Sequence, residues 1–184
     1  MDKTRAFRVS KLDAARRQLD CAIEMWFADK DEVSIHVLAT AAHQLIHDLK
    51  QKKGGGELLF DATIIKDEYR SEYISFLKKQ MNFFKHADSN AEEIIAFPPT
   101  LSILFMLFSI KGLEQLGERR NDIEHIFFLW VAIHKPTWAS PDFVELMAER
   151  VPVEHMDIAR SLKKQEFLES MTRALAESKY RGSV

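Results

Sequence analysis

Three histidines recur on one face of the helix that we predict over residues 33–53. At about 100° per residue, His36, His43 and His47 fall within roughly 40° of one another, because their offsets approach two and three helical turns. The opposite side of this helix carries three aliphatic residues, Leu38, Leu45 and Leu49. The pattern predicts that the helix packs through its leucines and that the histidines form a polar stripe opposite the core.

The pair His43 and His47 has the spacing that lets two imidazoles reach one metal ion from consecutive turns of a helix. Such a site needs further ligands, and His86 and Asp88, at the end of the next long helix, are candidate donors. Gln44 stands where a zinc metalloprotease with the H-E-x-x-H motif has its catalytic Glu, so that class is excluded. A solvated polar face and a buried polar site are the alternatives to a metal site.

A second candidate site lies in the stretch N-F-F-K-H-A-D, residues 82–88. A carboxylate at Asp88 could orient the imidazole of His86 for acid–base catalysis. Lys85 and His86 are equally suited to the negative end of a helix dipole, which is a purely structural role. Neither a nucleophile nor a bound substrate is identifiable beside them, so both interpretations stay open.

This stretch and two earlier ones resemble an uncharacterised family of bacterial proteins. The earlier stretches are S-K-L-D-A-A-R-R-Q-L-D-C-A-I, residues 10–23, and S-I-H-V-L-A-T-A-A, residues 34–42. The resemblance covers the first half of the chain well and implies a bacterial helical protein, without implying an activity. It places His36 and His86 inside the resembling stretches and leaves His43 and His47 just outside them.

The hexamer R-N-D-I-E-H, Arg120 to His125, resembles the signature of HEPN-type ribonucleases, which are all-α bundles. In that family the motif lies near a helix start, and two copies meet across a dimer. The resemblance implies that Arg120 stabilises phosphate charge, that His125 transfers protons and that Asn121 orients them. No metal is needed, because the 2′-hydroxyl of the RNA attacks the adjacent phosphate.

The elements that must position these residues are all helical, since no sustained alternating pattern of strands occurs. Ser10 and Asp13 form a capping signal for the first helix, Thr100 is a candidate cap of the helix over residues 101–116, and either Asn121 or Asp122 can cap the helix after it. We expect an all-α single bundle of five to six main helices around a buried central helix over residues 101–116. The further predicted helices begin near residues 67, 122, 141 and 152, the last running to about 178. We treat residues 1–184 as one helical domain with flexible ends at 1–9 and 179–184.

Composition narrows the class of protein. The chain has a net charge of −2, is 46% hydrophobic and holds one Cys, which argues against disorder, a disulfide scaffold and a broad nucleic-acid binder. Its N-terminus lacks an apolar signal core. Its longest apolar run, residues 101–110, spans roughly 15 Å as a helix, which is too short to cross a bilayer. We therefore expect a cytoplasmic protein without a membrane partner or a cofactor.

The leading functional hypothesis is a binding or interaction module, either a homodimer or a complex with a protein partner. It follows from a well-patterned core and the absence of a strong catalytic motif. The alternative is the HEPN-type, metal-independent ribonuclease, whose partner would be RNA. A second alternative is a metal-dependent site on the helix that carries His43 and His47.

Overall fold

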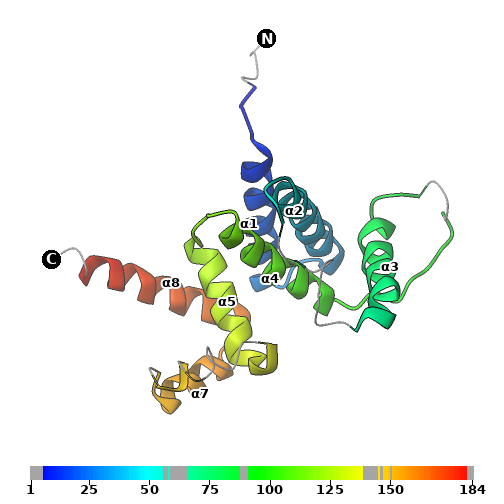
Figure 1. The fold of residues 1–184 in the computed structure, drawn as a ribbon. Helices are drawn as coiled ribbons and strands as arrows, with labels where there is room; N and C mark the ends of the chain where they lie inside the picture. Colours follow the sequence, from blue (N-terminus) through cyan, green and yellow to red (C-terminus); the bar gives the residue numbers. More distant parts are fainter. Residues whose placement is uncertain are drawn as a thin grey trace, which may run out of the picture. The chain divides into compact units, whose positions relative to one another are not determined.

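The computed structural model describes residues 6–55, 58, 66–87, 91–138, 145, 147–149 and 151–181. Every regular element within these ranges is a helix (Figure 1), which confirms the predicted all-α class. The remaining residues, including Asp88, both chain ends at 1–5 and 182–184, and most of the helix predicted at 141–150, lie outside the described part.

The chain divides into two compact units. Unit 1 comprises Met1–Ala22 and Asp31–Arg119, and unit 2 comprises Ile23–Lys30 and Arg120–Val184. The first helix, α1 (Lys11–Phe27), therefore contributes its N-terminal part to unit 1 and its last turn to unit 2. The expected single domain over residues 1–184 stays a prediction.

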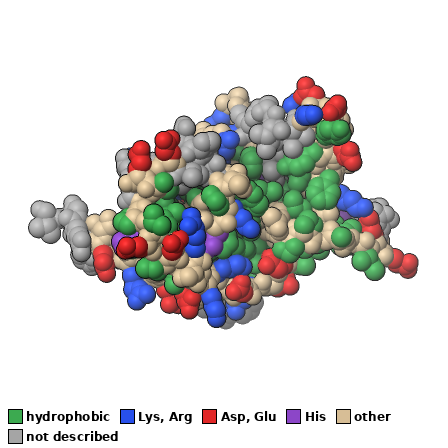
Figure 2. All heavy atoms as spheres, turned by 90° about the horizontal axis from the view of Figure 1, so that it is seen from below, with side chains coloured by type: hydrophobic (Ala, Val, Ile, Leu, Met, Phe, Trp, Pro, Cys, Tyr) green, Lys and Arg blue, Asp and Glu red, His purple; other side chains and the backbone are tan. Residues whose placement is uncertain are grey.

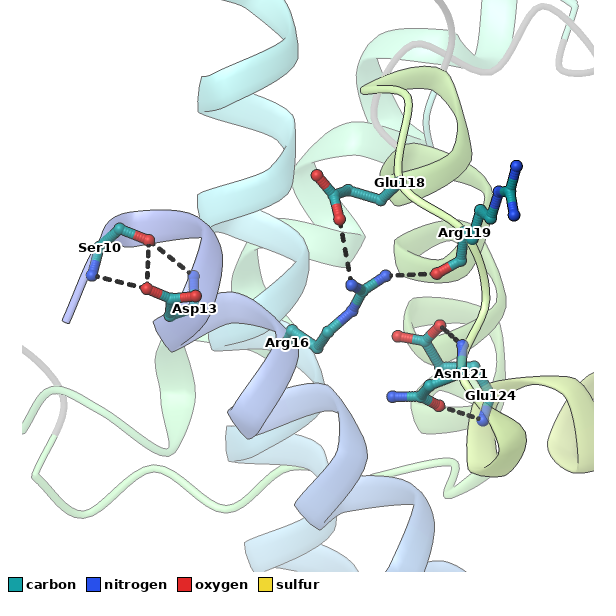
Figure 3. A network of polar contacts seen from close by, with 7 residues as sticks. All are labelled: Ser10, Asp13, Arg16, Glu118, Arg119, Asn121 and Glu124. Atoms are coloured by element: carbon teal, nitrogen blue, oxygen red, sulfur yellow. Dashed lines mark hydrogen bonds and ion pairs between the residues drawn. The ribbon is translucent and has the colours of Figure 1, made fainter.

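Unit 1 begins with the capping box that the sequence predicts at the start of α1 (Figure 3). The backbone N–H of Asp13 donates to Ser10 Oγ at 3.0 Å, and the backbone N–H of Ser10 donates to Asp13 Oδ2 at 3.1 Å. These bonds satisfy two of the donors that a helix start leaves without partners. Two turns further on, Arg16 Nη1 lies 3.1 Å from Glu118 Oε2, and Nη2 donates to the Arg119 carbonyl at 2.8 Å. Arg16 thus ties α1 to the segment that follows the central helix.

Helix α2 (Glu32–Lys52) and helix α4 (Thr100–Gln115) form the main packing contact of unit 1. Gly112 of α4 shows how closely they approach. A Cβ atom at this position would stand 2.4 Å from Ile46 Cγ2 and 3.2 Å from Leu58 Cδ2. Only a residue without a side chain fits there, so the fit between α2 and α4 depends on Gly112.

The central helix has a different start from the predicted one. Pro99 is the N-cap, and Thr100 is already the first helical residue, with no side-chain cap bond. The rings of Pro98 and Pro99 restrict the backbone at the helix start instead. The N–H groups of Leu101 and Ser102 donate to the carbonyls of Pro98 and Pro99, both at 3.0 Å, so these two donors have partners without a side-chain cap. Gly117, at φ 91°, follows the C-cap Leu116 and ends the helix.

Helix α3 (Asp67–Phe83) completes the described helices of unit 1, and it buries Leu77, Gln80 and Met81. Figure 2 shows a face of the molecule on which hydrophobic side chains interrupt the charged surface. The large hydrophobic side chains that unit 1 exposes include Phe7, Tyr69, Phe76 and Ile94.

Unit 2 contains α5 (Asp122–His134), the short 3₁₀ helix η2 (Pro136–Trp138), α7 (Val153–Ser161) and α8 (Lys164–Arg181). Its core is aromatic: the Trp26 ring meets Phe127 edge-on at 5.3 Å and Trp130 at 4.6 Å between centroids.

The single helix predicted from 152 to 178 is wrong, because Leu162 is extended and separates α7 from α8. Glu166 Oε2 accepts from the Lys163 N–H at 2.9 Å and starts the second helix anew. Residues 179–181, predicted to be flexible, belong to α8.

Candidate functional site

Two histidines of the row on α2, His36 and His43, are buried, and the third, His47, is half-buried, so the row does not form a solvated stripe opposite the core. His36 and His43 are 0% exposed, whereas Leu38, Leu45 and Leu49 are half-buried. The predicted orientation of this helix is therefore wrong. The prediction failed because it counted histidine as a polar residue. A neutral imidazole with a hydrogen-bond partner can be buried like an aromatic ring.

His36 is held by polar and aromatic contacts from three elements. Its Nδ1 lies 3.1 Å from Ser102 Oγ of α4. Its ring meets three phenylalanine rings edge-on, with centroid distances of 4.7 to 5.7 Å, namely Phe84, Phe97 and Phe105. Burial lowers the pKa of His36 to about 4, against the opposing effect of the Gln80 backbone, and the charge of Lys85 lowers it further. The imidazole is therefore neutral at pH 7 and closed off from solvent.

Two of the stretches that the sequence singles out meet at His36. Phe84 belongs to the stretch over residues 82–88, which follows α3, and its ring lies beside the imidazole of α2. His86 of the same stretch is exposed. Asp88 lies outside the described residues, so the proposed His86–Asp88 pair stays a prediction.

His43 and His47 lie one turn apart on α2, with ring centroids 6.3 Å apart and planes at 24°. The His43 ring also meets Phe105 edge-on at 5.1 Å. Burial lowers the pKa of His43 to about 3, and the charges of His47 and Lys50 act in the same direction. Within the described ranges, no group of three or more His, Cys, Asp or Glu side chains is placed to hold a metal ion. The metal site on this helix stays a prediction.

The hexamer over residues 120–125 lies at the start of α5 in unit 2. Asn121 is the N-cap: its Oδ1 accepts from the Glu124 N–H at 3.0 Å, and its own N–H donates to Glu124 Oε2 at 2.9 Å (Figure 3). This reciprocal pair is a capping box. It explains why Asn and Glu stand three residues apart without any catalytic requirement.

Arg120 and His125 flank this cap and influence each other electrostatically. The guanidinium carbon of Arg120 lies 3.9 Å from the ring centroid of Phe128, one turn beyond the histidine. His125 is half-buried. Burial lowers its pKa first and the positive charge of Arg120 second, while Asp122 raises it. The positive charge of Arg120 thus acts on an imidazole whose pKa is already lowered by burial.

Unit 1 also contains a cavity that the sequence does not predict. It has a volume of about 210 Å³ and lies where α2 and α4 end, lined by Lys50, Lys53, Gly55, Gln115 and Leu116. Lys50 is 4% exposed, and its Nζ donates to Gln115 Oε1. The sequence feature that could have pointed to this cavity is a pair of lysines, Lys50 and Lys53, just before a run of glycines. This pattern is also that of an ordinary helix end, so it does not by itself predict a cavity.

Comparisons of the chain with protein-family models, with curated proteins and with solved structures found no match. In the described part of the chain, no helix is both long enough and apolar enough to cross a membrane.

Proposed function

We propose that the chain is a cytoplasmic, non-catalytic binding module whose ligand site is the cavity between the ends of α2 and α4. The observation that carries this proposal is Lys50, which is 4% exposed and yet lines the cavity. Burial of an ammonium group costs free energy, so lysines are almost never fully buried unless they are paired. A concave site with a buried charged group is the usual form of a ligand site.

The lining of this cavity fits binding better than catalysis. General acid–base chemistry near neutral pH relies mostly on imidazoles and carboxylates. The described residues that line the cavity are lysine, glycine, glutamine and leucine, and include neither group. The most strongly perturbed imidazoles of unit 1, those of His36 and His43, are sealed within the packed core.

Retention of a small molecule by the chain tests this proposal. Untagged protein is dialysed against the small-molecule fraction of a bacterial extract, then denatured, and the released compounds are measured by mass spectrometry. We expect a compound that the wild type retains and that Leu116→Trp, which fills the cavity, does not. Ile94→Trp is the matched control, because Ile94 is 94% exposed. If the wild type retains nothing beyond what Leu116→Trp retains, the chain does not bind through this cavity.

A metal-independent ribonuclease is the second candidate, and the proximity of Arg120 and His125 favours it. A neutral His125 could take the proton from a 2′-hydroxyl, which attacks the adjacent phosphorus. The bond to the 5′-oxygen breaks, the departing oxygen takes a proton from water, and a 2′,3′-cyclic phosphate and a 5′-hydroxyl result. Arg120 would stabilise the added negative charge on the phosphate. The resemblance to HEPN proteins implies that a second copy completes this site.

RNA cleavage in the presence of EDTA tests the second candidate. A role in proton transfer predicts a loss of about a hundredfold or more in His125→Ala, and Arg120→Ala should lose activity as well. Arg119→Ala and His155→Ala are matched controls, since each removes an exposed side chain of the same type from outside the hexamer. The ribonuclease is excluded if no cyclic phosphate forms, or if the four variants cleave RNA equally.

A further inference from the structure

The cavity of unit 1 has a positive lining. Of the five described residues that line it, Lys50 and Lys53 carry positive charge, and none of the five has an acidic side chain. Lys50 is almost completely buried, so its charge acts through a medium that screens it less than water does. Such a lining favours a ligand with negative charge.

Among the side chains of the described lining residues, hydrogen-bond donors outnumber acceptors. A lysine ammonium carries three N–H donors and no acceptor. Lys50 donates to Gln115 Oε1, so the carbonyl oxygen of Gln115 is turned towards the lysine and its amide nitrogen adds two further donors. A ligand that matches this lining must present acceptor oxygens.

The volume limits the size of the ligand. Pockets for drug-sized molecules measure roughly 300–1,000 Å³, and this cavity measures about 210 Å³. A nucleotide or a polymer segment is therefore too large to be enclosed, whereas a group of a few heavy atoms fits.

We infer that this cavity binds a small oxyanion, a phosphate or a short-chain carboxylate, through Lys50 and Lys53. The inference rests on the proposed function of the chain as a binding module and names its ligand class. Lys50 is the anchor because it is buried and hydrogen-bonded to Gln115, and the exposed Lys53 adds a second positive charge to the lining.

A structural role for these lysines must be separated from binding, because cations near the end of a helix also stabilise it through the helix dipole. Lys52 makes this separation possible. It lies in the last turn of α2, as Lys50 does, but it is exposed and does not line the cavity. Lys52→Gln therefore removes a helix-end charge and leaves the cavity lining unchanged.

Isothermal titration calorimetry with inorganic phosphate and, separately, with acetate tests the inference, at constant ionic strength in chloride. We expect saturable binding of at least one of the two anions, weakened about tenfold or more in Lys53→Gln and in Lys50→Met. Lys52→Gln should bind like the wild type. Since Lys53 is exposed, Lys53→Gln gives a folded variant even if Lys50→Met unfolds.

The inference is wrong if neither anion saturates, or if Lys52→Gln weakens binding as much as Lys53→Gln. This result is distinguishable from failure of the proposed function. When Leu116→Trp loses a retained compound although neither anion binds, the cavity binds a ligand of another class. When both experiments are negative, the binding module itself is wrong.

Discussion

His36 Nδ1 and Ser102 Oγ lie 3.1 Å apart in the interface between α2 and α4, and both residues are 0% exposed. Each polar group satisfies the other in a place that water does not reach. The interface of unit 1 is therefore specified by a hydrogen bond between helices as well as by apolar contact, because any other register would leave both groups buried without this partner.

Removal of the serine hydroxyl should destabilise the chain. Ser102→Ala leaves the His36 nitrogen without that partner, so we expect the free energy of unfolding to fall by about 1–3 kcal/mol. Ser109→Ala is the control: Ser109 is equally buried, but its Oγ donates to the Phe105 carbonyl of its own helix at 2.7 Å. Urea denaturation compares the two, and an equal loss would show that the bond between helices adds nothing.

Acid should destabilise the chain through its buried imidazoles. The folded-state pKa values of His36 and His43 are about 4 and about 3, below the ordinary value of 6.5. Between these values and 6.5 the unfolded chain binds more protons, so stability is complete above pH 6.5 and is lost as the pH falls. Each histidine contributes a slope of up to about 1.4 kcal/mol per pH unit in this window.

Urea denaturation at pH 7, 6 and 5 measures this slope. His43→Gln removes one titrating group and should reduce the slope by up to about 1.4 kcal/mol per pH unit, although it also lowers stability at pH 7. His86→Gln is the control, because that side chain is exposed. A slope that is the same in His43→Gln and in the wild type would mean that His43 is not desolvated in the folded chain.

These results show which parts of the structure were readable from the sequence. Capping boxes at Ser10 and Asn121 involve residues three apart, so local spacing was enough to predict where α1 and α5 begin. The buried face of α2 could not be predicted from its own sequence, because Leu38 and His36 can both be buried in a core. Which of them is buried depends on the side chains of α4 that pack against α2. Ser102 and Gly112 decide it, by supplying a hydrogen bond and room for a close approach.

Gly112 should not tolerate alanine. Alanine favours a helix by about 1 kcal/mol over glycine, but its Cβ would stand 2.4 Å from Ile46 Cγ2. Overpacking of this kind costs about 1–3 kcal/mol, so we expect a net loss of stability.

Ile46→Ala removes the opposing methyl group. Gly112→Ala should cost clearly less in that background, and thermal unfolding of the four proteins in this double-mutant cycle measures the coupling. Equal costs in both backgrounds would mean that the two helices can move apart freely.

Zinc should leave the melting temperature of the chain unchanged. His43 is 0% exposed, so an ion bound by both imidazoles would have to be buried beside it, and the loss of hydration by a divalent cation opposes binding. The metal hypothesis predicts the opposite, a rise in melting temperature that is lost in His47→Ala. Differential scanning calorimetry of untagged protein, with zinc and with EDTA, decides between them.

Asn121 should matter for stability before it matters for any reaction. Asn121→Ala removes the capping bond to the Glu124 N–H, and we expect a loss of about 1 kcal/mol. Asn121→Ser keeps a capping oxygen and should keep most of that stability. The serine variant therefore separates the two roles: it lacks the side-chain amide that the HEPN resemblance assigns to orienting Arg120 and His125. If RNA is cleaved by the wild type and by Asn121→Ser at the same rate, Asn121 acts as a helix cap alone; a rate that falls while the unfolding midpoint stays constant assigns it to the reaction.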